Sequence, residues 1–122
     1  MQGFGSFIRQ QREALRTDDP RFSVRQLASR IGVEPSYLSK VEREIEPPPS
    51  EPKIRALAHE LGEDADTLLA RAGKVSTDLQ EAICHRPQLF SKLIRELRNH
   101  PDHAVLRVVQ DVQSDKKGKE KP

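Results

Sequence analysis

Apolar residues recur every three or four positions over most of the chain, a spacing typical of amphipathic helices. In the first 73 residues this spacing predicts five short helices, each with a local signal for its start or its end. The expected helices cover residues 4–16, 24–31 and about 35–43, a segment capped by Ser50 that ends at Gly62, and a segment capped by Asp64 that ends at Gly73. The pattern therefore predicts an all-α fold.

The second and third of these helices are separated by a very short connection. Ser23 precedes the second helix and Gln26 follows three residues later, which is the pattern of a capping box. Gly32 can adopt the left-handed conformation that ends a helix, and Pro35 suits the first turn of the next one. A short helix, a glycine-containing turn and another short helix predict a helix-turn-helix unit.

Beyond Gly73 the helical signals continue but are weaker. Pro87 can open a helix with one apolar side, whereas the Val-rich segment 104–112 fits either a helix or a strand. The Lys-rich tail 114–122 has nothing apolar to bury, so we expect it to be disordered.

Composition and charge indicate what the core consists of, whether one segment is basic, and whether disulfides are possible. The chain has 122 residues, only 4% of them aromatic and none of them Trp, so a core must consist mainly of Leu, Ile, Val and Ala. The net charge is only +2, but residues 1–45 contain eight basic and six acidic side chains and residues 46–75 four and six. A basic first segment could orient the molecule toward a polyanion. A single cysteine, Cys84, excludes an internal disulfide, and we expect a cytoplasmic, nucleoid-associated protein.

Residues 4–73 resemble the Cro/C1-type family of helix-turn-helix regulators, also called the xenobiotic-response-element-like family. The matching motifs are Leu27-Ala28, Gly32-Val33, Pro35-Ser36-Tyr37-Leu38-Ser39, Val41-Glu42-Arg43, the proline loop, Leu57-Ala58, Leu61-Gly62 and Leu68-Leu69. Two features depart from the family: Glu44 stands where a Gly is usual, and the connection Thr17 to Arg21 is longer.

The resemblance implies a five-helix, lambda-repressor-like DNA-binding domain at residues 1–73 with a C-terminal helical extension at 74–113. In that family the second helix of the motif enters the major groove. The residues implied to face base edges are Pro35, Ser36, Tyr37 and Lys40, and those implied to meet phosphates are Ser39 and Arg43. The resemblance also implies a structural ion pair between Arg12 and Glu42.

Elementary chemistry supports these roles. Lys40 can donate to guanine, Ser36 can donate or accept, and Pro35 or Tyr37 can touch a thymine methyl group. Ser23 begins a helix whose N–H groups could bind a phosphate, with Arg25 beside it. Ser23 could instead be only a helix cap and Arg25 only a solvated charge.

Glu34 could accept a hydrogen bond from cytosine or could merely start a helix.

The apolar stripe near the C-terminus predicts a subunit contact, because DNA-binding modules of this kind usually act as two-fold dimers. The candidate dimerisation residues are Leu89, Phe90, Leu93, Ile94 and Leu97. Alternatively, this segment could fold back on its own domain. The four Lys of the tail could attract phosphates or be a solvated end.

A cytoplasmic, dimeric bacterial or phage-type transcription repressor without a cofactor, bound to double-stranded operator DNA, is therefore the leading hypothesis. The alternative is an antitoxin or adaptor that binds a partner protein through its C-terminal helices and regulates its own operon. A metal sensor ranks third: its candidate ligands, which do not match a known zinc spacing, are His59, Cys84, His85, His100 and His103. Because we find no catalytic motif, we do not expect an enzyme.

Overall fold

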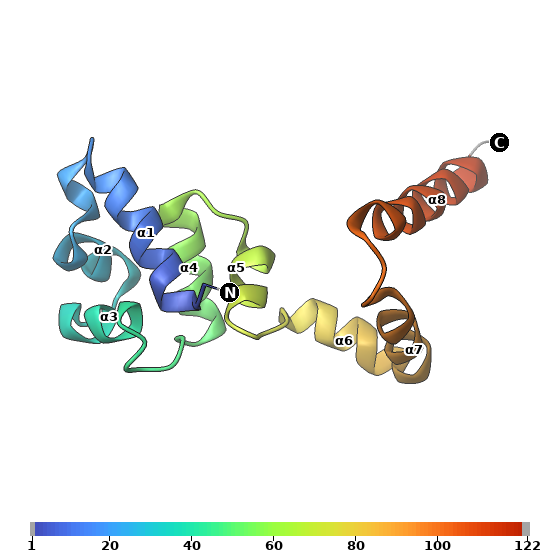
Figure 1. Cartoon of the computed structure of the whole chain (residues 1–122), viewed down its shortest axis with the longest axis horizontal. Coiled ribbons are helices and arrows are strands. Elements are labelled where there is room, and N and C mark those ends of the chain that lie inside the picture. The colour runs from blue at the N-terminus through green and yellow to red at the C-terminus, as the bar shows by residue number, and fades with distance from the viewer. Residues whose placement is uncertain (1, 121–122) are drawn as a thin grey trace. The chain divides into compact units, whose positions relative to one another are not determined.

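The computed structural model describes the backbone of residues 2–120 and the side chains of residues 2–115. Every regular element within these residues is a helix (Figure 1), so the predicted all-α fold is confirmed. In chain order the elements are α1 (Phe4–Arg16), the 3₁₀ turn η1 (Pro20–Phe22), α2 (Val24–Ile31), α3 (Pro35–Glu42), α4 (Glu51–Leu61), α5 (Ala65–Arg71), α6 (Thr77–His85), α7 (Pro87–Leu97) and α8 (Asp102–Glu120). The chain divides into two compact units, Met1–Thr77 and Asp78–Pro122, which we call unit 1 and unit 2.

Unit 1 has a single apolar core to which all five of its α-helices contribute. Its substantial helix contacts join α4 to α5, α3 to α1 and α2, and α4 to α1 and α2. The buried core residues are Phe4, Phe7, Ile8, Leu27, Ala28, Ile31, Leu38, Val41, Ile54, Leu57, Ala58, Leu61, Leu68 and Leu69. Each short helix thus contributes two to four apolar side chains, and the fold depends on their joint burial because helices this short are marginal in isolation.

Side-chain caps mark the starts of α2 and α5. The Ser23 hydroxyl accepts from the backbone N–H of Gln26 at 3.2 Å, and the Asp64 carboxylate accepts from that of Thr67 at 2.9 Å. The latter bond, together with the Thr67 hydroxyl, lowers the pKa of Asp64. The expected Ser50 cap differs, because its side chain makes no capping hydrogen bond.

The long connection between α1 and α2 contains the 3₁₀ turn η1, which the hydrophobic pattern does not predict. The Asp19 carboxylate accepts from the backbone N–H of Arg21 at 2.9 Å, and Pro20 occupies the first position of the turn. The Arg21 side chain also bonds the carboxylate, and it lowers the pKa of Asp19. An Asp-Pro pair was the available signal, because Asp accepts from backbone N–H groups in tight turns.

Unit 2 differs from unit 1 in burial, because none of its residues 78–115 is buried. The Val-rich segment is helical within α8, which removes the strand alternative. Helix α8 also continues to Glu120, whereas we expected disorder from residue 114. No Pro interrupts this segment before the final residue, and Asp, Lys and Glu are compatible with a helix. Residues 121–122 and the side chains of 116–122 lie outside the description.

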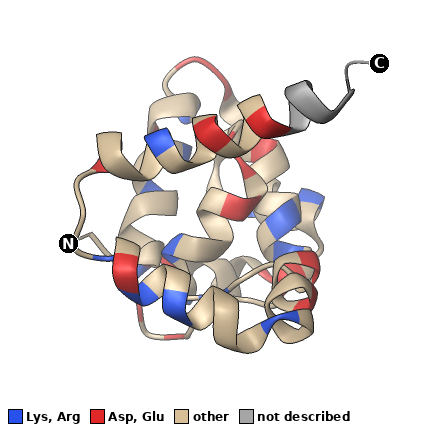
Figure 2. Ribbon diagram, turned by 90° about the vertical axis from the view of Figure 1, so that its right-hand side faces the viewer, with Lys and Arg blue, Asp and Glu red and all other residues tan. Residues whose placement is uncertain are grey.

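Charged residues of both signs are distributed along the ribbon (Figure 2). Helix α7 and the described part of α8 each carry both signs of charge: Lys92, Arg95 and Glu96 in α7, and Asp102, Arg107, Asp111 and Asp115 in α8. Within the described residues, no helix is long and apolar enough to cross a membrane.

Candidate nucleic-acid interface

The turn between α2 and α3 is fixed by its own backbone and by one side chain from α4. Gly32 ends α2 at φ 76°, and the N–H of Val33 donates to the carbonyl of Ala28 at 3.0 Å. The Lys53 ammonium group donates to the carbonyls of Ile31, at 3.1 Å, and Gly32, at 3.2 Å. These bonds satisfy carbonyls at the α2 C-terminus and tie the turn to α4, so α3 leaves α2 in a defined direction.

Helix α3 is held by one side and exposed on the other. Leu38 and Val41 are buried in the core, whereas Ser36 and Lys40 are exposed. Among the described residues Lys40 forms no side-chain hydrogen bond or ion pair, so its ammonium group is available to a ligand. The arrangement presents a short polar helix face on a rigid support, as binding to a groove requires.

The other two residues expected to face bases are only half-buried and have structural roles. Pro35 occupies the first turn of α3, and Tyr37 packs against the edge of the apolar core. Part of the Tyr37 ring is therefore unavailable to a ligand. Glu34 precedes the helix without a side-chain capping bond.

The residues expected to meet phosphates lie at both ends of the motif. The Ser23 hydroxyl is engaged as the α2 cap, while Arg25 in the first turn is exposed and, within the described residues, forms no ion pair. At the other end Ser39 is half-buried, and exposed Arg43 donates through Nε to the carbonyl of Ser39 at 3.3 Å. Ser23 thus caps α2, and its role at a phosphate stays a prediction that would use the backbone N–H groups of the first turn.

A buried ion pair locks the C-terminal end of α3 to α1. Arg12 Nε lies 2.7 Å from Glu42 Oε2 and Arg12 Nη2 lies 2.9 Å from Glu42 Oε1, and both side chains are only 4% exposed. Arg12 Nη1 donates to the carbonyl of Phe22 at 3.1 Å. Hydrogen bonding to Glu42 raises the pKa of Arg12. The expected structural pair is confirmed, and Arg12 is not available to DNA.

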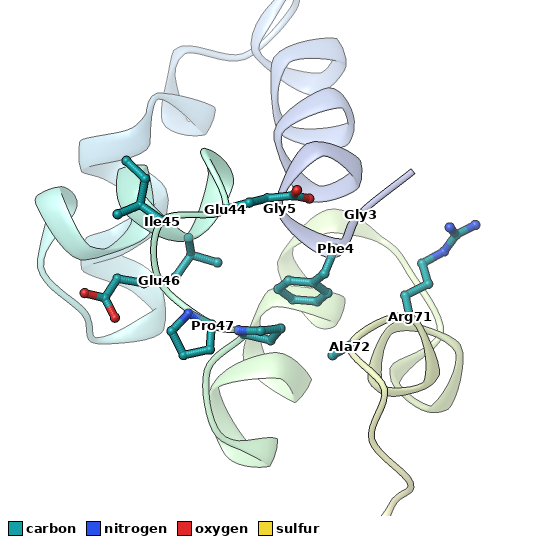
Figure 3. Close-up of a pocket in the computed structure, with 11 residues that line it drawn as sticks. Gly3, Phe4, Gly5, Glu44, Ile45, Glu46, Pro47, Arg71 and Ala72 are labelled. Atoms are coloured by element: carbon teal, nitrogen blue, oxygen red, sulfur yellow. The ribbon is translucent and has the colours of Figure 1, made fainter. Parts of the chain in front are cut away.

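The chain leaves α3 through Glu44, at the position where the resembled family usually has Gly. Glu44 is left-handed at φ 62°, so the backbone conformation suited to Gly is kept with a different side chain. Its carboxylate extends toward the start of α1 (Figure 3), where it accepts from the N–H of Ser6 at 3.4 Å. Since Gly3 supplies no side-chain cap there, Glu44 places a negative charge at the N-terminus of α1.

The same region encloses a hollow of about 350 Å³ between the start of α1, the loop after α3 and the end of α5 (Figure 3). Phe4, Val41, Ile45, Pro47 and Ala72 form much of its wall. The loop after α3 therefore lines a hollow that is partly open to solvent.

Two residues that position α3 were not identified from the sequence. Lys53 reaches the turn from α4, and nothing in its local sequence predicts this contact. Gly5 lies where α1 meets the end of α3, and a Cβ there would overlap the carbonyl oxygen of Val41. A glycine near the start of an amphipathic helix was the available signal for such a close approach. Within the described residues, no group of three or more His, Cys, Asp or Glu side chains could hold a metal ion.

Comparisons with known proteins agree with this geometry. Residues 4–84 match a family model described as a helix-turn-helix domain. Two relatives, both named as uncharacterized HTH-type transcriptional regulators of Mycobacterium tuberculosis, strains CDC 1551 / Oshkosh and ATCC 25618 / H37Rv, are each 44% identical over 69 residues. The match covers 57% of this chain but only 45% of each relative, so the chain spans less than half of their length. No solved structure gives a significant match. Because the family model covers more than half of the chain, this protein belongs to that helix-turn-helix domain family.

Proposed function

We propose that this protein is a sequence-specific DNA-binding transcription regulator of the Cro/C1 type, which reads operator DNA with α3 in the major groove. The observation that carries the proposal is the two-sided character of α3. Leu38 and Val41 fix one side in the core, while Ser36 and Lys40 are exposed on the rest of the helix. A helix of this width fits the major groove of about 12 Å, where base pairs differ in their donors and acceptors.

In this proposal Arg25 and Arg43 bind phosphates on either side of the groove. They lie at the start of α2 and just after α3, so the two contacts would fix the register of the motif on the duplex. Ser23 and Ser39 contribute through backbone or hydroxyl groups, and Pro35 and Tyr37 make apolar contacts with bases.

The regulator acts as a dimeric cytoplasmic repressor, because one short helix reads few base pairs and a compact binder regulates most simply by occupying an operator. Two copies related by a two-fold axis would read half-sites about 34 Å apart. Selection from a random DNA library, followed by footprinting with the full chain, tests this directly. We expect a pseudo-palindrome with one-turn spacing, and failure to enrich any motif would contradict the proposal.

Replacing Lys40 by Ala is expected to weaken binding to the selected operator by about 1–3 kcal/mol and to relax the preference at one base position. The cause is loss of a donor to a base edge from the exposed face of α3. Titration of operator and scrambled duplexes at one salt concentration measures both effects. Arg95→Ala removes the same charge from unit 2 and is the matched control. Equal losses for both variants would contradict the role of Lys40.

Replacing Arg25 by Ala should instead weaken binding to all duplexes to a similar extent. Losing one phosphate contact should reduce the slope of log affinity against log salt by about 0.9. Binding measured at several salt concentrations gives this slope. An unchanged slope would mean that Arg25 is the solvated charge of the alternative interpretation.

A protein-interaction role is the second candidate, supported by the exposed apolar residues of unit 2. In that role an antitoxin or adaptor binds a partner protein through α6–α8 and controls its own operon through unit 1. A protein that stays monomeric at every concentration and forms a stable complex with the product of a neighbouring gene would favour it.

A further inference from the structure

Helix α7 carries an apolar surface that the described residues of unit 2 cover only in part. Leu89 is 65% exposed, Leu93 42% and Ile94 54%, and with the half-buried Phe90 and Leu97 they form what we call the α7 stripe. A groove of about 500 Å³ runs along it, lined by Arg86, Leu89, Phe90, Lys92, Leu93 and Glu96. Continuous apolar surface on a helix that has no fully buried residue marks an interaction site.

The charged residues Lys92 and Glu96 beside the α7 stripe indicate which partner would be complementary to it. Lys92 and Glu96 are four residues apart, so they lie along the same edge of the helix, and both line the groove. The stripe is centred on Leu93, and the Lys92–Glu96 pair is centred one residue further on, at Ile94. The apolar stripe and its flanking charges therefore share nearly the same midpoint.

A second copy of the same helix, running antiparallel, satisfies this pattern. In antiparallel packing the same edge of both helices meets, so Lys92 of each copy lies opposite Glu96 of the other while the two stripes interdigitate. In parallel packing that edge meets the opposite edge, which carries Ser91 and Arg98. Arg98 could then face Glu96, but Lys92 would have no acidic partner, so only antiparallel packing pairs both charges. The contact is isologous, as a two-fold dimer requires.

We propose that the α7 stripe is the dimer interface of this protein, formed by antiparallel packing of α7 against α7 of a second copy. The proposal deepens the proposed function, because that function rests on a dimer, but self-association can be measured without DNA. The partner is a second copy of this chain because the order of Lys92 and Glu96 about the centre of the stripe is complementary to itself.

Helix α8 repeats the pattern and provides the competing arrangement. Its apolar residues have the same spacing as the α7 stripe, and Arg107 and Asp111 correspond to Lys92 and Glu96. An antiparallel hairpin of α7 and α8 within one chain would pair Lys92 with Asp111 and Glu96 with Arg107. The structure leaves the α7 stripe exposed, with no substantial packing between α7 and α8. The α7 stripe also has the larger apolar side chains, Leu, Phe and Ile, where α8 has Ala and Val.

Charge exchange within α7 separates the two arrangements. Sedimentation equilibrium of the full chain at low salt should give a dimer, and Lys92→Glu should raise its dissociation constant about fivefold or more, because like charges then meet twice. The double variant Lys92→Glu/Glu96→Lys should restore dimerisation, since each new Glu again faces a Lys. Arg95→Glu, on the opposite side of the helix, makes the same charge change and should leave the dissociation constant within twofold.

A parent protein that remains monomeric, or a double variant that associates no better than the single one, would overturn the proposal. The second result is the one expected from α7–α8 packing, in which the exchange creates two repulsive pairs. Circular dichroism checks that the helix content of the chain is kept, and Leu93→Asp should abolish the dimer with little loss of helix. Binding to a duplex with a single half-site should be unchanged in Lys92→Glu. If no variant binds any half-site, the DNA-binding proposal fails while the interface remains tested by sedimentation.

Discussion

Replacing Glu42 by Leu is expected to lower the free energy of unfolding by about 3–5 kcal/mol, because Arg12 then stays buried without its counter-charge. The two side chains are 4% exposed and joined by two hydrogen bonds of 2.7 and 2.9 Å. Water cannot replace Glu42 without opening the contact between α1 and α3. Urea denaturation followed by circular dichroism measures the loss.

The double variant Arg12→Met/Glu42→Leu is the matched control. Removing both charges leaves an apolar pair of similar volume, so most of the stability should return. If the single and double variants were equally unstable, packing at this position, and not the unpaired charge, would explain the loss. A single variant as stable as the parent would contradict the assignment of a buried pair.

Replacing Gly5 by Ala should lower the free energy of unfolding by about 3 kcal/mol, near the upper end for an overpacked contact. Its Cβ would overlap the carbonyl oxygen of Val41 and lie 2.9 Å from that of Glu42. Main-chain atoms at the end of α3 cannot move as a side-chain tip can, so α1 must shift. At an open helical site the same substitution stabilises by about 0.5–1 kcal/mol, which makes the sign of the effect a test.

The Gly62→Ala variant distinguishes the cost of steric overlap from the cost of an unfavourable backbone conformation. Gly62 is left-handed at φ 71° with nothing within 4 Å of an added Cβ, so only the conformational cost of about 1–2 kcal/mol applies. We expect Gly5→Ala to be the more destabilising of the two in thermal and urea unfolding. A stabilised Gly5→Ala protein would show that α1 and α3 are less closely packed than described.

Several local features followed from the sequence because their causes are local. The Ser23 and Asp64 caps and the left-handed Gly32 depend on a few neighbouring residues, and the structure has all three. The bounds of α1 and α2 match the predicted ranges for the same reason. The 3₁₀ turn at Pro20–Phe22 was missed because apolar spacing carries no signal for so short an element.

The candidate interface could be predicted only in part. Lys40 and Arg25 are exposed as a ligand contact requires, whereas Tyr37 shares its ring with the core and the Ser23 hydroxyl is used as a cap. Their DNA contacts and the dimer contact of the α7 stripe stay predictions. A helical wheel shows which side of α3 is polar, but it does not show how much of each side chain packs against or hydrogen-bonds to neighbouring residues.

The sequence by itself determined the five α-helices of unit 1, the helix-turn-helix motif and the apolar stripe of α7, because periodicity, caps and glycines act over a few residues. Only the tertiary structure decided what holds the motif in place. Three contacts do this: Lys53 on the turn, Gly5 against the end of α3, and the left-handed Glu44 at the start of α1. They join residues that are 21 to 38 positions apart. Local patterns do not specify the two partners of such a contact, since the contacts arise when separate helices bury their apolar faces in one core.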